Sequence, residues 1–131
     1  MAGLLRTACL ASTAAIVLAV ATTASLAAGD AAKGATAFKG KCATCHTVDK
    51  GAPNGALGPN LFGAVGRKAA SLASFKYSAA LSTSGITWSD DNLKGWVMNP
   101  QKVVPGTKMV LIHAPSSEDA DDIIAFLDTK K

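Results

Sequence analysis

The stretch GKCATCHTVDKG, residues 40–51, contains two of the three cysteines and one of the two histidines in the chain. Cys42, Cys45 and His46 read C-x-x-C-H, a spacing typical of covalent attachment of a c-type haem. Each thiol can add to one vinyl group of the porphyrin, and the adjacent imidazole can supply the proximal nitrogen to the iron. The stretch therefore predicts one haem c per chain, attached through Cys42 and Cys45.

Three other chemistries fit a C-x-x-C pair and stay open from these residues alone. A redox dithiol of the thioredoxin type needs a strand–helix–strand unit, and no such pattern surrounds the pair. A structural zinc site needs four ligands, usually supplied as two separated pairs, whereas His113 is the only other His or Cys after residue 28 and offers no second pair. A plain disulfide suits an oxidising compartment but gives no reason for the adjacent histidine.

The first 28 residues have the pattern of an export signal. Arg6 is followed by an apolar, alanine-rich run that has no charged residue before Asp30 and ends in small residues. The run is long enough to span a bilayer, so an uncleaved anchor is the alternative, although its many Ala, Thr and Ser residues make it only moderately apolar. We predict a cleaved signal peptide over residues 1–28 and one domain over residues 29–131.

The sequence of residues 29–131 predicts helices separated by long loops. A capping Asp or Ser precedes each apolar periodic stretch, which gives helices over residues 30–40, 78–83, 89–99 and 116–131. Residues 47–66 and 99–109 carry the Gly and Pro residues typical of loops. Lys130 and Lys131 are expected in the last turn of the final helix, where the helix dipole favours cations. The predicted fold class is all-α, and Gly34 can let the first and last helices cross closely.

If His46 takes one axial position of a haem iron, the second ligand decides the chemistry, because two strong protein ligands favour electron transfer over small-molecule binding. Met98, Met109 and His113 are the candidates within the domain. Met98 falls in a predicted helix as a packing or surface residue, and an isolated loop histidine is usually a solvated side chain. Met109 follows Pro105 and Gly106, whose turn can aim its sulfur inward, so Met109 is the predicted distal ligand.

Four longer stretches carry a resemblance to a known family: GDAAKGATAFKGKCATCHTVDKG, GPNLFGAVGRK, GITW and NPQKVVPGTKM. Their order resembles that of the class I cytochromes c, and they look most like mitochondrial cytochrome c and its small soluble bacterial relatives. The resemblance extends over essentially the whole of residues 29–131. It implies a single-domain, all-α class I cytochrome c fold in which short helices and long loops wrap around one covalently bound haem.

Carried onto this sequence, the resemblance implies the residues of the site. His46 and Met109 would be the axial ligands, and the Pro59 carbonyl would accept a hydrogen bond from the other ring nitrogen of His46. The residues that it places around the haem are Cys42, Cys45, Pro59, Arg67, Tyr77, Trp88 and Thr107. Of these, Arg67, Tyr77 and Trp88 would bind or screen the propionates, and Thr107 would organise the methionine side.

Three positions depart from the mitochondrial pattern. Trp96 replaces a tyrosine near the distal methionine, Leu111 replaces a phenylalanine at the haem edge, and Leu81 replaces an asparagine near a propionate. Each exchange changes polarity or shape beside the haem. The ligand set is unaffected, but the resemblance does not fix the redox potential or the strength of the bond from Met109 to iron.

The resemblance implies a soluble electron-transfer protein, not an enzyme, that shuttles single electrons between complexes of a respiratory chain through a His/Met-ligated haem. The alternative is a haem enzyme or sensor with a labile distal site, showing peroxidase-like activity or small-ligand binding. Mitochondrial cytochromes lack an export signal of this type. The predicted location is therefore the bacterial periplasm.

The implied partners are transient, acidic-faced redox proteins, such as a quinol-oxidising cytochrome complex and a terminal oxidase or photosynthetic reaction centre. The protein itself would be a monomer, peripheral to the membrane. The net charge of +4 falls to about +3 without Arg6, and a basic face is expected near the haem edge from Lys41, Lys68, Lys76, Lys94, Lys102 and Lys108. Scattered basic residues without a binding motif do not indicate a nucleic-acid partner.

Overall fold

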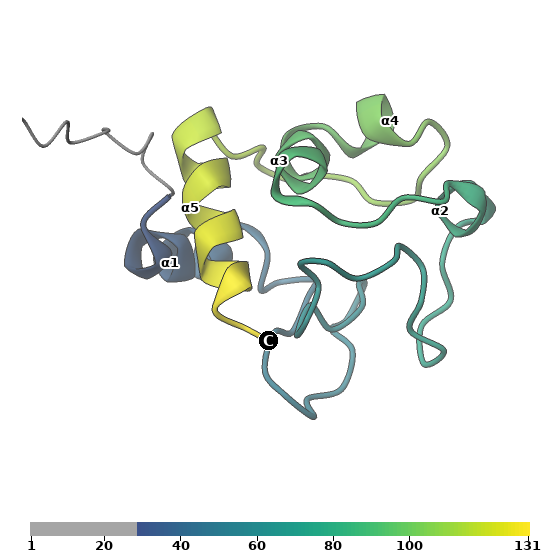
Figure 1. The fold of residues 1–131 in the computed structure, drawn as a ribbon, viewed down its shortest axis with the longest axis horizontal. Coiled ribbons are helices and arrows are strands. Elements are labelled where there is room, and N and C mark those ends of the chain that lie inside the picture. Colours follow the sequence, from purple (N-terminus) through teal and green to yellow (C-terminus); the bar gives the residue numbers. More distant parts are fainter. Residues whose placement is uncertain (1–28) are drawn as a thin grey trace, which may run out of the picture.

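The computed structural model describes residues 29–131, which form short helices joined by long loops. The helices are α1 (Ala31–Lys41), α2 (Ala79–Thr83), α3 (Asp90–Met98), α4 (Pro100–Val103) and α5 (Ser117–Asp128) (Figure 1). Within this range there is no β-strand, and only an isolated antiparallel bridge joins Lys68 to Thr87. The all-α prediction is confirmed.

The predicted signal peptide, residues 1–28, lies outside the described residues. In the part of the chain that the structure describes, no helix combines the length and apolar character needed to cross a membrane.

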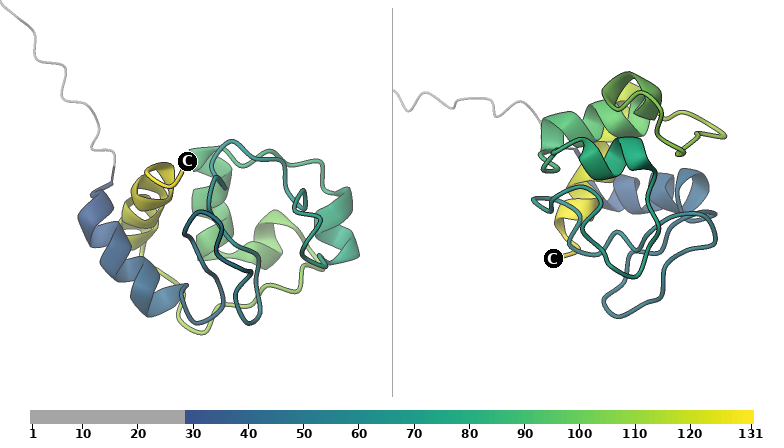
Figure 2. Two further views of the ribbon diagram at one scale, coloured as in Figure 1. Left: turned by 90° about the horizontal axis from the view of Figure 1, so that it is seen from below. Right: turned by 90° about the vertical axis from the view of Figure 1, so that its right-hand side faces the viewer.

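Helices α1 and α5 cross at one end of the molecule, and both views of Figure 2 show them in contact. The crossing is close because Gly34 on α1 faces the α5 backbone, where an added Cβ would lie 1.9 Å from the carbonyl O of Asp122. The buried Asp122 carboxylate accepts a hydrogen bond from the backbone N–H of Asp30 at 2.6 Å. The close approach predicted from Gly34 is thus confirmed.

The helices begin where the capping residues predict. The Asp30 side chain accepts hydrogen bonds from two backbone N–H groups in the first turn of α1, and Ser89 does the same for one in α3. At the start of α5, Ser116 and Asp119 form a reciprocal capping box. These caps satisfy backbone donors that have no partner inside the helix.

The C-terminal end of α5 differs from the prediction. The helix ends at Asp128, so Lys130 and Lys131 lie beyond its last turn, which contains no basic residue. Lys130 instead extends to the loop that follows the C-x-x-C-H motif, where its Nζ lies 2.9 Å from Oδ1 of Asp49. The lysine therefore ties the end of the chain to that loop.

The predicted loop over residues 99–109 contains the short helix α4. Asn99 caps it by accepting a hydrogen bond from the backbone N–H of Lys102, and Pro100 occupies its first turn. Proline suits this position because its fixed φ matches a helix and its missing N–H would have no helical partner. Beyond α4, Gly106 has a φ of 85°, which lets the chain turn back toward the molecule.

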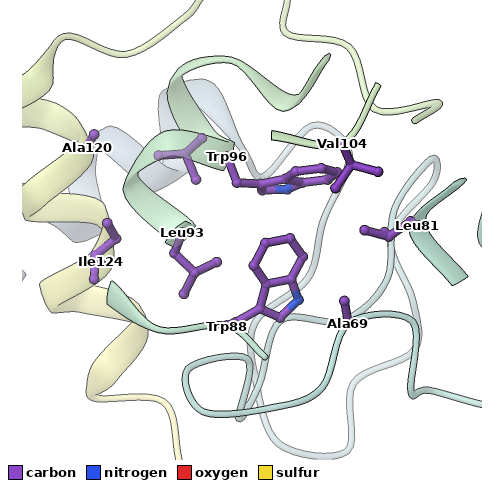
Figure 3. Packing of buried hydrophobic residues seen from close by; sticks show 9 residues of the cluster. Ala69, Leu81, Trp88, Leu93, Trp96, Val104, Ala120 and Ile124 are labelled. Atoms are coloured by element: carbon purple, nitrogen blue, oxygen red, sulfur yellow. The ribbon is translucent and has the colours of Figure 1, made fainter. Parts of the chain in front are cut away.

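The buried side chains form two clusters that connect the helices to the loops. The first lies between α1 and α5 and comprises Phe38, Val48, Ile123 and Leu127. The second joins α3 to α5 and to the loops, and its main members are shown in Figure 3. At its centre Trp88 and Trp96 lie with their ring centroids 5.0 Å apart, inclined at 50°.

Candidate haem site

A cavity of about 380 Å³ opens beside the two clusters, a volume typical of small-molecule sites. Its walls come from the end of α1, the loop after it, α3 and the segment between α4 and α5. All nine residues singled out in the sequence line it: Cys42, Cys45, His46, Pro59, Arg67, Tyr77, Trp88, Thr107 and Met109. The fold thus assembles residues from positions 42 to 109 around one space.

The imidazole of His46 is held by a hydrogen bond to the loop at Pro59. Its Nδ1 lies 2.9 Å from the carbonyl O of Pro59, which is the contact that the family resemblance implies. Because a carbonyl can only accept, Nδ1 of the neutral ring carries the proton and Nε2 keeps its lone pair. Burial lowers the pKa of His46, which the Pro59 hydrogen bond partly opposes, so the ring is a neutral electron-pair donor at physiological pH.

Gly58 forms the surface on which this ring lies. A Cβ at Gly58 would be 2.2 Å from Cε1 and 2.8 Å from Nε2 of His46, so no side chain fits there. Residue 58 directly precedes Pro59, and the two positions together hold the ring in one orientation. Sequence reasoning included Gly58 only as one of many loop glycines.

The two cysteines lie in the turn that ends α1. Cys42 caps the helix, and its carbonyl accepts hydrogen bonds from the backbone N–H groups of Cys45 and His46, both at 3.0 Å. Both thiols are free. Burial, and secondarily the proximity of Cys45, raises the pKa of the Cys42 thiol to about 11, so it is protonated at neutral pH.

Residues 29–131 do not form the surroundings that a zinc site or a thioredoxin-like dithiol would need. No group of three or more His, Cys, Asp or Glu side chains gathers there as a metal site, so a four-ligand zinc set is not assembled. The strand–helix–strand unit of a thioredoxin-like dithiol does not occur in this range either.

Met109 also lines the cavity, and its backbone is held by the turn that follows α4. The buried Thr107 hydroxyl accepts a hydrogen bond from the backbone N–H of Met109 at 3.5 Å. Gln101 braces the same turn, since its amide donates to the carbonyl of Thr107 at 2.7 Å and accepts from the backbone N–H of Gly106 at 3.2 Å. Gln101 was missed in the sequence because its two partners are identifiable only once α4 has formed.

The other two candidate distal ligands lie differently. Met98 is 37% exposed and does not line the cavity, as expected for a surface position on a helix. His113 lines the cavity, and its side chain is exposed to solvent. Of the two methionines, only Met109 is positioned at the site.

Arg67 and Tyr77 supply polar groups to the cavity wall. The Arg67 guanidinium donates to the carbonyl O of Phe62 at 2.8 Å and to that of Asn60 at 3.2 Å, which fixes the side chain against the loop that contains both residues. Burial raises the pKa of Tyr77, and the Arg67 charge partly opposes this effect. Both groups are therefore protonated hydrogen-bond donors at neutral pH.

The three departures from the mitochondrial pattern all border the cavity, since Leu81, Trp96 and Leu111 are among its lining residues. Trp96 and Leu81 also belong to the second core cluster (Figure 3). These exchanges therefore change the wall of the site.

Four of the six lysines expected around the haem edge line the cavity, namely Lys41, Lys68, Lys76 and Lys108. The other two do not. Lys94 lies 2.7 Å from a carboxylate oxygen of Asp121 on α5, and Lys102 lies on α4. The expectation of a basic face holds for fewer lysines than the sequence suggests.

The cytochrome c family model matches residues 31–131. The chain belongs to the cytochrome c family. Cytochrome c of Theileria annulata is 50% identical over 99 residues, covering 76% of this chain and 84% of the relative. Cytochrome c of Ulva intestinalis is 46% identical over 99 residues, covering 76% and 88%. A solved structure, cytochrome cH from Methylobacterium extorquens, matches with a TM-score of 0.70 at 46% identity, covering 78% of this chain and 100% of that chain.

These matches confirm the resemblance to class I cytochromes c and the predicted fold. They make the chain an electron-transfer haem protein, whose family cofactor is covalently bound haem c. The site of this cytochrome c fits that group, because two thiols, a neutral imidazole and a thioether line one largely apolar cavity. The absence of a side chain at Gly58 leaves the room that the His46 ring needs in this site.

Proposed function

We propose that this cytochrome c is a one-electron carrier in which Cys42 and Cys45 would hold the haem, with His46 and Met109 as the ligands of its iron. The single observation that carries the proposal is that these four side chains line the same cavity. When bound, haem c supplies an iron centre that gains and releases one electron.

The protein side chains set how readily that centre changes its charge. The Pro59 carbonyl holds the His46 ring in place and raises its basicity as a ligand. A thioether is a soft donor that favours the reduced metal, and a buried site disfavours the additional charge of the oxidised metal. Both effects raise the redox potential.

The polar wall of the cavity is suited to the carboxylates of the porphyrin. The Arg67 guanidinium, the Tyr77 hydroxyl and the Trp88 indole N–H all belong to cavity-lining residues and can donate hydrogen bonds to propionates. Thr107 supports the methionine side through its contact with the Met109 backbone. We assign these four residues to haem binding on this basis.

The proposed location is the bacterial periplasm, supported by the export-signal pattern of residues 1–28 and by the likeness to cytochrome cH of a bacterium. The proposed partners are transient redox proteins with acidic faces, a quinol-oxidising complex on one side and a terminal oxidase or photosynthetic reaction centre on the other. The positive charges at the cavity support this choice of partner. The protein would act as a monomer peripheral to the membrane.

The decisive experiment compares the visible spectra of the exported, haem-containing wild type with those of Met109→Ala and Met98→Ala. We expect a low-spin c-type spectrum in the wild type, with the weak red sulfur-to-iron band in its oxidised form. Met109→Ala should lose the band and become high-spin, whereas Met98→Ala should retain both features. The reduced wild type should bind carbon monoxide poorly. Ready carbon monoxide binding would instead favour a haem enzyme or sensor with a labile distal site.

A further inference from the structure

The carboxylate of Asp122 is buried on α5 and has no cation beside it among residues 29–131. The residue is only 6% exposed. Within that range its side chain accepts one hydrogen bond, from the backbone N–H of Asp30 at 2.6 Å, and it takes part in no ion pair. Aspartates are seldom buried without a partner, because a charge removed from water is costly unless an opposite charge lies close by. A positive group beside Asp122 would therefore stabilise this fold.

Gly29 lies against the same part of α5. A Cβ at Gly29 would be 2.2 Å from the carbonyl C and O of Asp121 and 2.4 Å from the backbone N of Asp122. Because these are backbone atoms, which cannot rotate aside, only glycine fits at this position. Bond lengths keep successive backbone nitrogens within about 3.7 Å of each other. The N atom of Gly29 therefore lies no more than about 6.5 Å from Oδ1 of Asp122.

The two other carboxylates next to Gly29 already have partners. The Asp30 side chain caps α1 and accepts hydrogen bonds from two backbone N–H groups of its first turn. On α5, a carboxylate oxygen of Asp121 lies 2.7 Å from Nζ of Lys94. Asp122 is therefore the carboxylate at this end of the molecule that lacks a cation within residues 29–131.

Removal of the predicted export signal would create a cation at this place. Hydrolysis of the peptide bond between Ala28 and Gly29 consumes one water molecule, leaving a carboxylate on Ala28 and an α-ammonium group on Gly29. The nitrogen of Gly29 is an uncharged amide before that step and is positively charged at neutral pH after it. Cleavage therefore supplies the charge that the surroundings of Asp122 lack.

We propose that Asp122 and the adjoining α5 backbone bind the α-ammonium group of Gly29, so that removal of the signal attaches the mature N-terminus to α5. The inference rests on the proposed export and is independent of the electron-carrier function. The ion pair joins the start of α1 to α5 where the two helices cross (Figure 2). One additional residue before Gly29 would carry the charge up to about 3.7 Å farther away.

The first test determines where the mature chain begins. The haem-containing protein is exported with its own signal, and the mass of the intact chain is measured. We expect the chain to start at Gly29. A chain that keeps the signal, or that begins at another residue, would overturn the proposal.

The second test titrates the α-ammonium group of the mature wild type by NMR, through the Cα signal of Gly29. We expect its pKa to lie at least about one unit above the ordinary value of about 8, because a carboxylate within several ångströms favours the charged form. A pKa of about 8 or lower would overturn the proposal. This measurement needs no substitution, so it decides the question even if a variant fails to fold.

Two variants assign the effect to one carboxylate. Asp122→Asn keeps an oxygen that can accept the hydrogen bond from Asp30 but removes the charge, and it should return the pKa of the α-ammonium group to about 8. Asp121→Asn is the matched control, a neighbouring carboxylate with a lysine partner of its own, and it should leave the raised pKa unchanged. The other charged groups at this end of α1 and α5, Lys33 and Glu118, lie 3.6 Å apart and are the same in every chain.

The third test measures stability by guanidinium denaturation at pH 7. Four haem-containing chains are compared: the mature chain and one with a single alanine added before Gly29, each with and without Asp122→Asn. We expect the added alanine to lower the folding equilibrium constant at least fivefold when Asp122 is present and less than twofold in Asp122→Asn. The advantage should disappear as the pH rises through the folded-state pKa of the α-ammonium group. Equal losses in the two backgrounds would overturn the proposal.

Discussion

Gly34→Ala tests whether the crossing of α1 and α5 depends on the absence of a side chain. The added Cβ would lie 1.9 Å from the carbonyl O and 2.5 Å from the carbonyl C of Asp122, and 2.8 Å from Cβ of Phe126. The first two are backbone atoms, which cannot rotate away as the end of a flexible side chain can. The helices must therefore separate, or one of them must shift along the other.

The magnitude follows from that separation. An ordinary contact begins near 3.4 Å, so the backbones must move apart by about 1.5 Å. Overpacking of this kind costs about 3 kcal/mol when the neighbours cannot yield, and the hydrogen bond from Asp30 to Asp122 is worth about 1 kcal/mol. Alanine recovers about 1 kcal/mol through its better helix propensity. We expect a net loss of about 3 kcal/mol, or a midpoint temperature lower by roughly 10–20 °C.

The free energy of unfolding is measured on the haem-containing protein by guanidinium denaturation followed by far-UV circular dichroism. Gly40→Ala is the matched control, because Gly40 lies in the same helix and a Cβ there meets nothing within 4 Å. It should leave stability unchanged or raise it by up to about 1 kcal/mol. If the two variants differ by less than about 0.5 kcal/mol, the reasoning from close backbone approach is wrong.

Two other substitutions probe the site and a helix cap. Gly58→Ala would place a Cβ 2.2 Å from Cε1 of His46; the ring must move, so we expect a much lower yield of low-spin holoprotein than for Gly40→Ala, measured from the visible spectrum. Hydrogen bonds from the backbone N–H groups of Lys33 and Ala32 hold the pKa of Asp30 below its ordinary value. Because its pKa is lower in the folded state, the charged Asp30 stabilises the folded protein at pH values above the unfolded-state pKa of about 4. This stabilisation is lost as the pH falls toward the folded-state pKa. Asn keeps the capping oxygen but does not titrate, so in urea denaturation the stability advantage of the wild type over Asp30→Asn should shrink between pH 6 and pH 3.

The starts of the helices were predictable because their causes are local. Ser89 and Ser116 lie directly before apolar periodic stretches, and a side-chain oxygen there can reach only the N–H groups of the next turn. The helix α4 was missed for a related reason. The predicted helix over residues 89–99 stops before Pro100, but with Asn99 as a cap the same proline begins a new helix.

The identities of the site residues were predictable, whereas the contacts that hold them in place were not. The C-x-x-C-H motif and the family resemblance supplied all nine cavity-lining candidates. The chain has 12 glycines, and no local pattern distinguishes Gly58, which lies against the His46 ring, from Gly40, which lies against nothing. That difference arises only when the loop folds back over the motif, so it belongs to tertiary structure.

The positions of the lysines show the same limit. Lysines can be counted in a sequence, and six of them suggested a basic face near the haem edge, but ion pairs engage Lys41 and Lys94. Four of the six line the cavity, and Lys94 and Lys102 do not. With fewer free charges there, salt should weaken partner binding less than the lysine count alone would indicate.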